Sequence, residues 1–542
     1  MRKKLRFESV VTLVRSELPP RTVAVFLAAS ALISALLGIF RDRWLNAMYF
    51  DTYKAGLDAY TAAFTIPDFM FNLLIAGAIS VTFIPVFTQR LKTGNQKSAW
   101  ELTSSVINLL ALVSLAAAVI IFIFAGPIVR STIGQGFNAT TQALTISLMR
   151  VVTVNLFLFS ISAVVTSVQN SLGRFINFAL APIIYNICII IGIRVFTGGI
   201  TIFGFELFDG GIMGVALGVV LGAILQLAVA MIGLFGLGMD YEFKVYWRNQ
   251  GLRKILRLMP ARIADQGLDQ LSSVIVNTSL ASSMASGTVR SLQQASSLAV
   301  MPVNLIGTAI STAFFPQIAQ SADEESLFQK RLLAAIRGIL WVAIPVATVA
   351  FFARGYVVNF IKNGGAPLIS ALLGILCVTI VSRCLFQIVV RGFYAQQDTK
   401  TPFIISLICV TTTILMSLTL VLAFDWGAYG LAFATAAGSL LEVLILLTTL
   451  GFRHPGLFPV TFLRAVMRMF AAAFFAAIIT YSMVRFFPLR ATDDSFWITF
   501  PRFSLIAGSG LLTYFIACYF LNLDDVKPIL NQAKRILFRN AK

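Results

Sequence analysis

The chain has 542 residues, of which 58% are hydrophobic and only 12% are charged, and its formal net charge is +19. A soluble domain carries roughly 25% charged residues, so this composition excludes a soluble globular protein. Apolar runs recur along the whole chain, so the composition predicts an integral membrane protein. The positive charges lie mainly between those runs, which is a topology signal of membrane proteins, so we expect no nucleic-acid partner.

Fourteen apolar segments are long enough to be membrane-spanning helices. They lie near residues 23–40, 57–87, 103–126, 143–168, 177–197, 212–238, 257–283, 289–318, 333–353, 367–391, 402–423, 427–451, 463–486 and 500–521. We expect the first to be retained as a helix rather than removed as a signal peptide, because no clear cleavage context follows it. The predicted fold is therefore an all-α polytopic membrane protein with 14 transmembrane helices.

The distribution of Lys and Arg orients these helices. If the N-terminus is cytoplasmic, most inside connections are richer in positive charge than the outside ones, and the connection around 241–257 alone carries five. This bias predicts that both termini are cytoplasmic. The basic segment 522–542 is predicted to be an amphipathic tail on the inner leaflet, where anionic lipid attracts Lys and Arg.

One phrase occurs twice. AISVTFIP (78–85) ends the predicted second helix, and AISTAFFP (309–316) ends the eighth. A second sequence similarity relates NSLGRFINFALAP (170–182) to VRGFYAQQDTKTP (390–402), at matching places in the topology. The sequence therefore predicts two parallel six-helix repeats around a central cavity, plus two extra C-terminal helices, an arrangement known in transporters.

These patterns predict six parts of the chain. They are a basic cytoplasmic N-terminus at 1–22, the first repeat at 23–240, a cytoplasmic linker at 241–256, the second repeat at 257–451, the two extra helices at 452–521 and the cytoplasmic tail at 522–542.

Polar residues inside predicted spans need a reason, because a charge there costs about 2.5–3.5 kcal/mol on insertion scales. In the seventh helix, Arg262, Asp265 and Asp269 fall at i, i+3 and i+7, and Ser272, Ser273 and Asn277 extend the polar side. A stripe of this length favours the wall of a water-filled cavity. The alternative is a structural ion pair between Arg262 and Asp265.

Three other predicted helices carry charges at equivalent places in the two repeats. The first ends in Arg41 and Asp42, the second carries Asp58 and Asp68 with an interruption expected at Pro67, and the eighth begins near Arg290. We therefore predict a central portal lined by helices one, two, seven and eight. Its candidate substrate-binding residues are Arg41, Asp42, Asp58, Arg262, Asp265, Asp269 and Arg290. Three further charges stand isolated within predicted spans: Arg150, Arg383 and Glu442. Each is either a further site candidate or a side chain that snorkels or is paired locally.

The sequence carries no catalytic constellation. It has no Walker A motif, no zinc-ligand spacing and no nucleophile motif. Its five cysteines all lie in apolar segments, and its single histidine, His454, lies in a loop. We therefore predict a transporter rather than an enzyme, with no cofactor and no metal, driven by a gradient, by the membrane potential or by coupling to later steps.

Several segments resemble a known family. LLGIFRD (36–42) is similar to the Leu-Gly-x-x-Arg-Asp signature of the MurJ (MviN) lipid II flippases, members of the multidrug/oligosaccharidyl-lipid/polysaccharide (MOP) exporter superfamily. Further matches are Asp58 with AFTIP (63–67), GAISVTFIPVF (77–87), GQGF (134–137), GRF with AP (173–175, 181–182), ASGTV (285–289) and GFYAQQDTKTP (392–402).

The resemblance implies a function. Such a protein would flip lipid II, the polyprenyl-pyrophosphate-linked peptidoglycan precursor, from the inner to the outer leaflet of the bacterial cytoplasmic membrane by alternating access. The implied partners are this lipid-linked glycan precursor, membrane lipids and cell-wall synthesis proteins. The cavity physics suits the task, because a pyrophosphate needs cations and a sugar-peptide head needs polar walls.

The sequence also departs from the family pattern at positions where charges are expected. The uncharged residues at these positions are Ala35, Phe71, Asn72, Ala76, Ser296 and Ser297. Three alternatives therefore stay open: a flippase for another polyprenyl-linked glycan, a cation-coupled drug exporter of the same superfamily, and a degenerate membrane scaffold that transports nothing. The exporter would explain the missing arginines together with the retained carboxylates.

We hypothesise that Arg262 and Arg290 supply replacement cations for the pyrophosphate. Replacing both by Glu is expected to stop flipping, because a carboxylate repels the phosphate groups. The measurement is accumulation of inward-facing lipid II in cells that insert the variant normally. Flipping that survives both charge reversals would remove the hypothesis.

Overall fold

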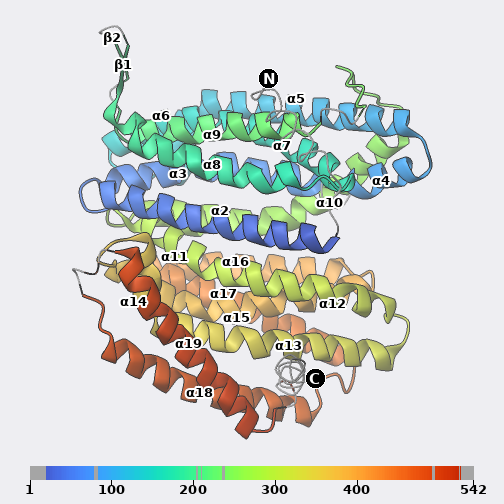
Figure 1. Cartoon of the computed structure of the whole chain (residues 1–542), viewed down its shortest axis with the longest axis vertical. Helices are drawn as coiled ribbons and strands as arrows, with labels where there is room; N and C mark the ends of the chain where they lie inside the picture. The colour runs from blue at the N-terminus through green and yellow to red at the C-terminus, as the bar shows by residue number, and fades with distance from the viewer. Residues whose placement is uncertain are drawn as a thin grey trace, which may run out of the picture. The chain divides into compact units, whose positions relative to one another are not determined.

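The computed structural model describes residues 20–78, 83–202, 205–208, 210–234, 238–490, 493, 495–523 and 525. It divides into two compact units, Met1–Val289 and Arg290–Lys542 (Figure 1), which are treated separately below. The described part is helical except for its loops and one small β-hairpin. This confirms the predicted all-α polytopic fold. The predicted N-terminal segment lies mostly, and the predicted C-terminal tail almost wholly, outside the described residues.

Eleven helical segments of the described chain are long and apolar enough to cross a membrane. They coincide with the predicted helices three to six and eight to fourteen, so the chain is a multi-pass membrane protein. The other three predicted spans also coincide with helices, at 20–49, at 54–78 with 84–92, and at 250–280, but their residues are described only in part. The count of fourteen therefore stays a prediction.

The first unit contains most of the elements that position the candidate site. They are α2 (Pro20–Tyr49), α3 (Lys54–Ala78), α4 (Ile84–Lys92), α5 (Gln96–Ile128), η2 (Val129–Ile133), α6 (Ala139–Val152), α7 (Val154–Ser171), α8 (Ile176–Arg194), η3 (Phe196–Gly198), β1 (Ile200–Ile202), β2 (Phe205–Phe208), α9 (Ile212–Ile232), α10 (Gln250–Ser272) and η4 (Ser273–Leu280). η2 and η4 are π-helices, and η3 is a 3₁₀-helix.

Two local features of the first unit differ from the sequence prediction. The predicted fourth helix is two helices, α6 and α7, which meet at Thr153. The connection between α8 and α9 contains an antiparallel hairpin of β1 and β2, for which no strand was predicted. Both features arise in segments whose apolar pattern alone does not fix the backbone conformation.

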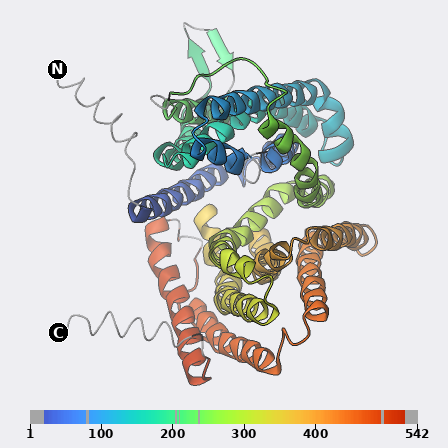
Figure 2. The same ribbon diagram turned by 90° about the vertical axis from the view of Figure 1, so that its right-hand side faces the viewer.

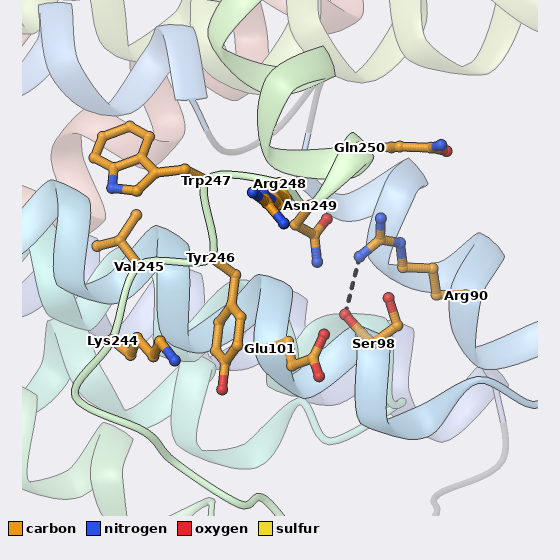
Figure 3. Close-up of a pocket in the computed structure, with 10 residues that line it drawn as sticks. All are labelled: Arg90, Ser98, Glu101, Lys244, Val245, Tyr246, Trp247, Arg248, Asn249 and Gln250. Atoms are coloured by element: carbon orange, nitrogen blue, oxygen red, sulfur yellow. Dashed lines mark hydrogen bonds between the residues drawn. The ribbon is translucent and has the colours of Figure 1, made fainter.

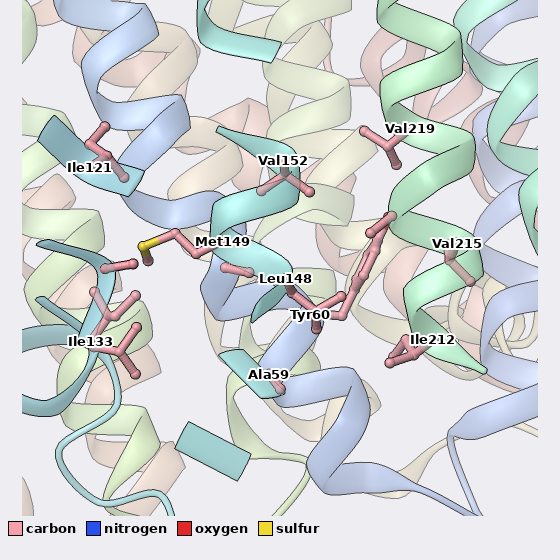
Figure 4. Close-up of a cluster of buried hydrophobic side chains, with 14 of the residues drawn as sticks. Ala59, Tyr60, Ile121, Ile133, Leu148, Met149, Val152, Ile212, Val215 and Val219 are labelled. Atoms are coloured by element: carbon pink, nitrogen blue, oxygen red, sulfur yellow. The ribbon is translucent and has the colours of Figure 1, made fainter. Parts of the chain in front are cut away.

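Close helix packing holds the first unit together. α8 and α9 are in extensive contact, and a Cβ atom added to Gly192 would lie 2.7 Å from the Cα of Gly218. Small residues let membrane helices approach closely, so that dispersion contacts replace the missing hydrophobic drive. The apolar core lies among α3, α5, α6 and α9 and includes Tyr60, Met149 and Val219 (Figure 4).

The predicted interruption of the second helix at Pro67 is wrong. α3 runs through Pro67 without ending. A proline removes one backbone hydrogen bond and bends a helix, but membrane helices tolerate it where neighbouring helices pack around it. α3 has such neighbours, because it contacts α6, α7 and α10.

The second unit is built around α15. Its elements are α11 (Thr288–Pro302, which begins at the end of the first unit), the π-helix η5 (Val303–Gly307), α12 (Thr308–Gln320), α13 (Glu325–Phe352), α14 (Arg354–Ile361), α15 (Pro367–Ala395), α16 (Lys400–Leu422), α17 (Gly427–Arg453), α18 (Val460–Phe486) and α19 (Phe496–Phe520). α15 contacts α12, α13 and α17, and α18 packs along α19 (Figure 2).

The predicted repeat stays a prediction. AISTAFFP lies in α12, but four residues of AISVTFIP, 79–82, lie outside the described residues. The predicted seventh helix, α10 with η4, belongs to the first unit, where α10 packs against α3. The proposed boundaries of the six parts are likewise not tested by the fold.

The turn in GFYAQQDTKTP joins the ends of three helices. Oδ1 of Asp398 accepts hydrogen bonds from the backbone N–H groups of Lys400 and Thr401, both at 3.0 Å, which caps the start of α16. Oδ2 accepts one from Nη1 of Arg453, at the end of α17, at 2.5 Å. Gln397, just after α15, has a φ of 60°. This segment is therefore a structural joint between α15, α16 and α17.

The pKa of Asp398 reflects this joint. Partial burial alone would raise it, but hydrogen bonds from Thr401 and the charged group of Arg453 outweigh that effect and lower it to about 2. A carboxyl whose pKa is lower in the folded than in the unfolded state stabilises the fold above its unfolded pKa, near 4. That stabilisation is lost as the pH falls from about 4 toward 2.

We expect Asp398→Ala to lower the free energy of unfolding by about 1 kcal/mol, because a helix cap is lost, and Asp398→Asn to cost less. The difference from wild type should be constant between about pH 5 and 8 and shrink only below about pH 4. Thermal unfolding of the protein in detergent measures it, with Asp323→Ala at an exposed turn as the control. A difference that vanishes near pH 6 would contradict the assignment.

Candidate functional site

Arg41 and Asp42 lie on α2 and are held against α8. Nη1 of Arg41 donates to Oδ1 of Asn186 at 3.0 Å, and Nη2 of Arg41 lies 3.2 Å from Oδ1 of Asp42. Nδ2 of Asn186 donates back to Oγ of Ser34 on α2 at 3.3 Å. The side chains of Arg41 and Asp42 are 28% and 25% exposed, so the pair is anchored but still reachable.

Polar and aromatic groups from α3 and α8 surround this pair. Arg41 interacts electrostatically with Tyr60 and Tyr185, and Tyr185 also interacts with Asp68. We call the set of Arg41, Asp42, Tyr60, Asp68, Tyr185 and Asn186 the α2–α3–α8 polar cluster. Rings extend it, because Tyr185 meets Phe159 edge to face with 5.4 Å between ring centroids.

The chemistry of the cluster is mixed rather than cationic. Asp42 and Asp68 outnumber Arg41 within it, while the tyrosine hydroxyls and the Asn186 amide offer neutral hydrogen-bonding groups. Such a surface suits hydroxyls and amides and can stack against the apolar face of a ring. It is less suited to a pyrophosphate, which needs an excess of donors carrying positive charge.

Asp58 belongs to a second arrangement, formed where three segments of the first unit meet. Its side chain is 2% exposed, and Oδ2 accepts a hydrogen bond from the backbone N–H of Gly287 at 2.5 Å. A Cβ atom added to Gly136 would lie 2.2 Å from the Cα of Ser283, so the turn at 134–137 packs directly on this loop. We call Asp58, Gly136, Ser282, Ser283 and Gly287 the loop clamp.

A further contact continues from the loop clamp along the same two helical segments. Oγ1 of Thr65 on α3 lies 3.1 Å from Oγ1 of Thr278 on η4. On η4, Nδ2 of Asn277 donates to Oγ of Ser273 at 3.2 Å. The π-helix rotates this end of the predicted polar stripe away from regular helical spacing, and π-helical turns are frequent at functional sites.

The other predicted site residues are less fully placed. α10 holds the backbone of Arg262, Asp265 and Asp269 against α3, but their side chains lie outside the described residues. Arg290 lies on α11 with its side chain 7% exposed. It belongs to the second unit, whereas the α2–α3–α8 polar cluster belongs to the first, so its part in the site stays a prediction.

Of the three further intramembrane charges, Arg383 and Glu442 are paired locally, which is one of the predicted alternatives. Nη1 of Arg383 on α15 lies 3.3 Å from Oε2 of Glu442 on α17, and Oγ of Ser406 on α16 donates to Oε1 of Glu442 at 2.6 Å. Pairing lowers the cost of placing two charges within the membrane. The third predicted charge, Arg150, donates to the carbonyl oxygen of Phe122 at 3.3 Å and stacks over its ring.

Comparison with known proteins then assigns the chain. A family model described as lipid II flippase MurJ matches residues 47–500. The chain belongs to the MurJ lipid II flippase family.

Among the described residues, no group of three or more His, Cys, Asp or Glu side chains could hold a metal ion.

Individual relatives agree with this family assignment. A probable lipid II flippase MurJ of Bdellovibrio bacteriovorus is 27% identical over 468 residues, which cover 83% of this chain and 85% of the relative. A probable lipid II flippase MurJ of Haemophilus influenzae is 26% identical over 439 residues, covering 77% and 83%.

Solved structures show the same fold. A lipid II flippase MurJ in an inward closed conformation aligns with a TM-score of 0.69 and 23% identity, covering 95% of this chain and 99% of that one. An inward-facing multidrug resistance transporter of the MATE family, a member of the MOP superfamily, aligns with a TM-score of 0.65 and 16% identity, covering 80% and 98%.

The geometry gives a physical reason for several segments that resemble MurJ family motifs. In LLGIFRD, Gly38 faces Asn186, because a Cβ atom at Gly38 would lie 4.0 Å from Oδ1 of Asn186. Gly38 thus lies on the side of α2 that faces the amide that binds Arg41, although a Cβ atom would fit there in ordinary contact. GQGF and ASGTV meet in the loop clamp, where Gly136 allows close backbone packing and Gly287 has a φ of +95°.

We expect Asp58→Ala to lower the free energy of unfolding by about 1–3 kcal/mol, because the buried N–H of Gly287 loses its acceptor. Asp58→Asn keeps an acceptor oxygen and should cost less. Hydrogen exchange of a peptide covering 282–288, in detergent-solubilised protein, should rise in Asp58→Ala and less in Asp58→Asn. Unchanged exchange in both variants would show that this hydrogen bond does not hold the loop.

Proposed function

We propose that this protein flips lipid II from the inner to the outer leaflet of the bacterial cytoplasmic membrane by alternating access. The observation that carries the proposal is the match of the lipid II flippase family model to residues 47–500. A MurJ of known structure aligns over 95% of this chain, so the two share a fold, which supports the proposal. The activity is transport, so we infer no enzymatic step.

The proposed division of labour follows the chemistry of each group. The α2–α3–α8 polar cluster would contact the sugar and peptide parts of the head, because it offers hydroxyl, amide and aromatic groups beside Arg41 and Asp42. Arg262 and Arg290 would supply cations for the pyrophosphate. Asp265 and Asp269 would form a polar wall, and Asp58 would act through the loop clamp.

The proposed energetics and topology agree with the charge distribution. With both termini in the cytoplasm, an inside-negative potential favours outward movement of an anion by about 2.3 kcal/mol per charge per 100 mV. The proposed topology comprises fourteen spans in two parallel six-helix repeats and two extra helices. Cell-wall synthesis proteins, which use the flipped precursor, are the proposed protein partners.

A cation-coupled drug exporter is the second candidate. It is favoured by the excess of carboxylates over Arg41 in the α2–α3–α8 polar cluster, because carboxylates bind protons, metal cations or cationic drugs. The MATE transporter with a TM-score of 0.65 shows that the same fold is used in that class. The match to the MurJ family model favours the flippase.

Complementation tests the proposal. In bacteria depleted of their lipid II flippase, this protein should restore growth and reduce inward-facing lipid II, measured by its accessibility to an external enzyme. Arg41→Gln should lower that activity at least tenfold, because one charge-assisted hydrogen bond is worth about 1.5–3 kcal/mol. The control Arg485→Gln, at an exposed helix end, should leave the activity unchanged. Both variants must insert equally.

Each other outcome points to an alternative. Normal insertion without rescue would contradict lipid II as the substrate and favour another polyprenyl-linked glycan or a non-transporting scaffold. Raised drug resistance without rescue would favour the exporter.

A further inference from the structure

A polar pocket lies at one end of the first unit, remote in sequence from the candidate site. It has a volume of about 620 Å³ and is formed where α4 ends, α5 begins and the 238–249 linker leads into α10 (Figure 3). Its lining residues are Arg90, Ser98, Glu101, Lys244, Val245, Tyr246, Trp247, Arg248, Asn249 and Gln250.

Hydrogen bonds fix the linker wall of this pocket. Nδ2 of Asn108 on α5 donates to the carbonyl oxygens of Glu242 and Lys244, at 2.8 and 3.0 Å. The backbone N–H of Tyr246 donates to Oγ of Ser105 at 2.9 Å. The linker is thus attached along one face of α5, and the pocket is part of the built structure.

The opposite wall is fixed as well. Nη1 of Arg90, just before the end of α4, donates to the carbonyl oxygen of Ser98 at 2.9 Å. Nε of Arg253 on α10 donates to the carbonyl oxygen of Trp247 at 3.0 Å. Figure 3 shows the Arg248 and Asn249 side chains between Tyr246 and Arg90.

The charge of the pocket favours an anion. Arg90, Lys244 and Arg248 contribute three positive charges, and Glu101 contributes one negative charge. Glu101 interacts electrostatically with Arg90 and Tyr246, and Glu242, just outside the lining, accepts a hydrogen bond from the hydroxyl of Tyr246. These two carboxylates offset part of the field of the three cations. Arg and Lys are the side chains that bind phosphate groups.

The depth of the pocket places it at the height of lipid headgroups. The apolar run of α5, 106–128, spans about 35 Å at 1.5 Å per residue, close to the thickness of the hydrocarbon core. Glu101 lies five residues before this run, or about 7–8 Å beyond the edge of the core. The headgroup layer on each side of a bilayer is about 5–8 Å thick.

Aromatic side chains mark the same level. Phe243 is 92% exposed and Trp247 is 58% exposed, both on the linker that forms the pocket. Tryptophan is enriched at the boundary between headgroups and acyl chains, where one end of the ring is wet and the other apolar. Next to a cationic pocket, they provide an apolar surface for the start of an acyl chain.

We propose that this pocket binds the phosphate headgroup of an anionic phospholipid of the surrounding membrane. Lys244 and Arg248 contact the phosphate, Arg90 forms the fixed wall behind it, and Trp247 meets the upper acyl chain. The bound lipid fastens the linker between α9 and α10 to the membrane. This site is separate from the proposed flipping of lipid II and stands or falls independently of it.

The test measures lipid binding to the full-length protein in neutral detergent. The probe is phosphatidylglycerol with brominated acyl chains, which quenches tryptophan fluorescence, and brominated phosphatidylcholine is the neutral reference. Quenching that is absent in Trp247→Phe reports this pocket. We expect saturable quenching by phosphatidylglycerol and little by phosphatidylcholine.

The pocket variant is Lys244→Gln with Arg248→Gln, and the matched control is Lys254→Gln with Arg257→Gln, which removes two exposed charges nearby but outside the lining. The pocket variant should bind phosphatidylglycerol about 30-fold more weakly, the factor for about 1 kcal/mol per cation. The control should change less than threefold.

Several results would overturn the proposal. They are equal quenching by both lipids, equal losses of phosphatidylglycerol affinity in both double variants, and displacement of the lipid by millimolar inorganic phosphate, which would indicate a site for a free anion.

A measurement on wild type alone serves if the pocket variant misfolds. Raising the salt concentration from 50 to 500 mM should weaken phosphatidylglycerol binding, and binding that does not depend on salt would contradict the proposal.

Discussion

A charged side chain among membrane helices is costly unless it is paired, and such pairs join helices in both units of the chain. Arg41 is satisfied by Asn186 and Asp42, which joins α2 to α8. Asp58 accepts a backbone hydrogen bond from Gly287 and so fixes the loop after η4. In the second unit, Glu442 joins α15, α16 and α17. The charged residues that are costly in lipid thus join helices, alongside close contacts of small residues such as Gly192 with Gly218.

The helices could be predicted from the sequence because the length of an apolar run is a local property. The failures concern what is not local. Pro67 was expected to end a helix, yet the packing of α6, α7 and α10 around α3 keeps it continuous. The Arg383–Glu442 pair joins residues far apart in the chain, and the only available signal was that two opposite charges fall within spans of the same predicted repeat.

Only the charged residues of the candidate site could be predicted from the sequence. Arg41, Asp42 and Asp58 stand out because each is charged near or within an apolar segment. Asn186 and Tyr185, which complete the environment of Arg41, are uncharged residues in an apolar run, and no sequence rule gives the rotation of α8 toward α2. The contact between Gly136 and Ser283 depends on two loops meeting, which helix periodicity does not encode.

The loop clamp bears on whether the chain is a decayed scaffold. Asp58 is buried and accepts a hydrogen bond from the backbone N–H of Gly287, and loss of this acceptor would leave a buried donor unsatisfied. The close packing of Gly136 on Ser283 beside it holds the fold of a transporter and of a scaffold alike. The chain differs from the family pattern at charged positions such as Ala35 and Asn72, yet it has Asp58 and both glycines of the clamp. The departures from the family pattern therefore fall at positions expected to bind the substrate, so a loss of transport would come from those positions and not from loss of the clamp.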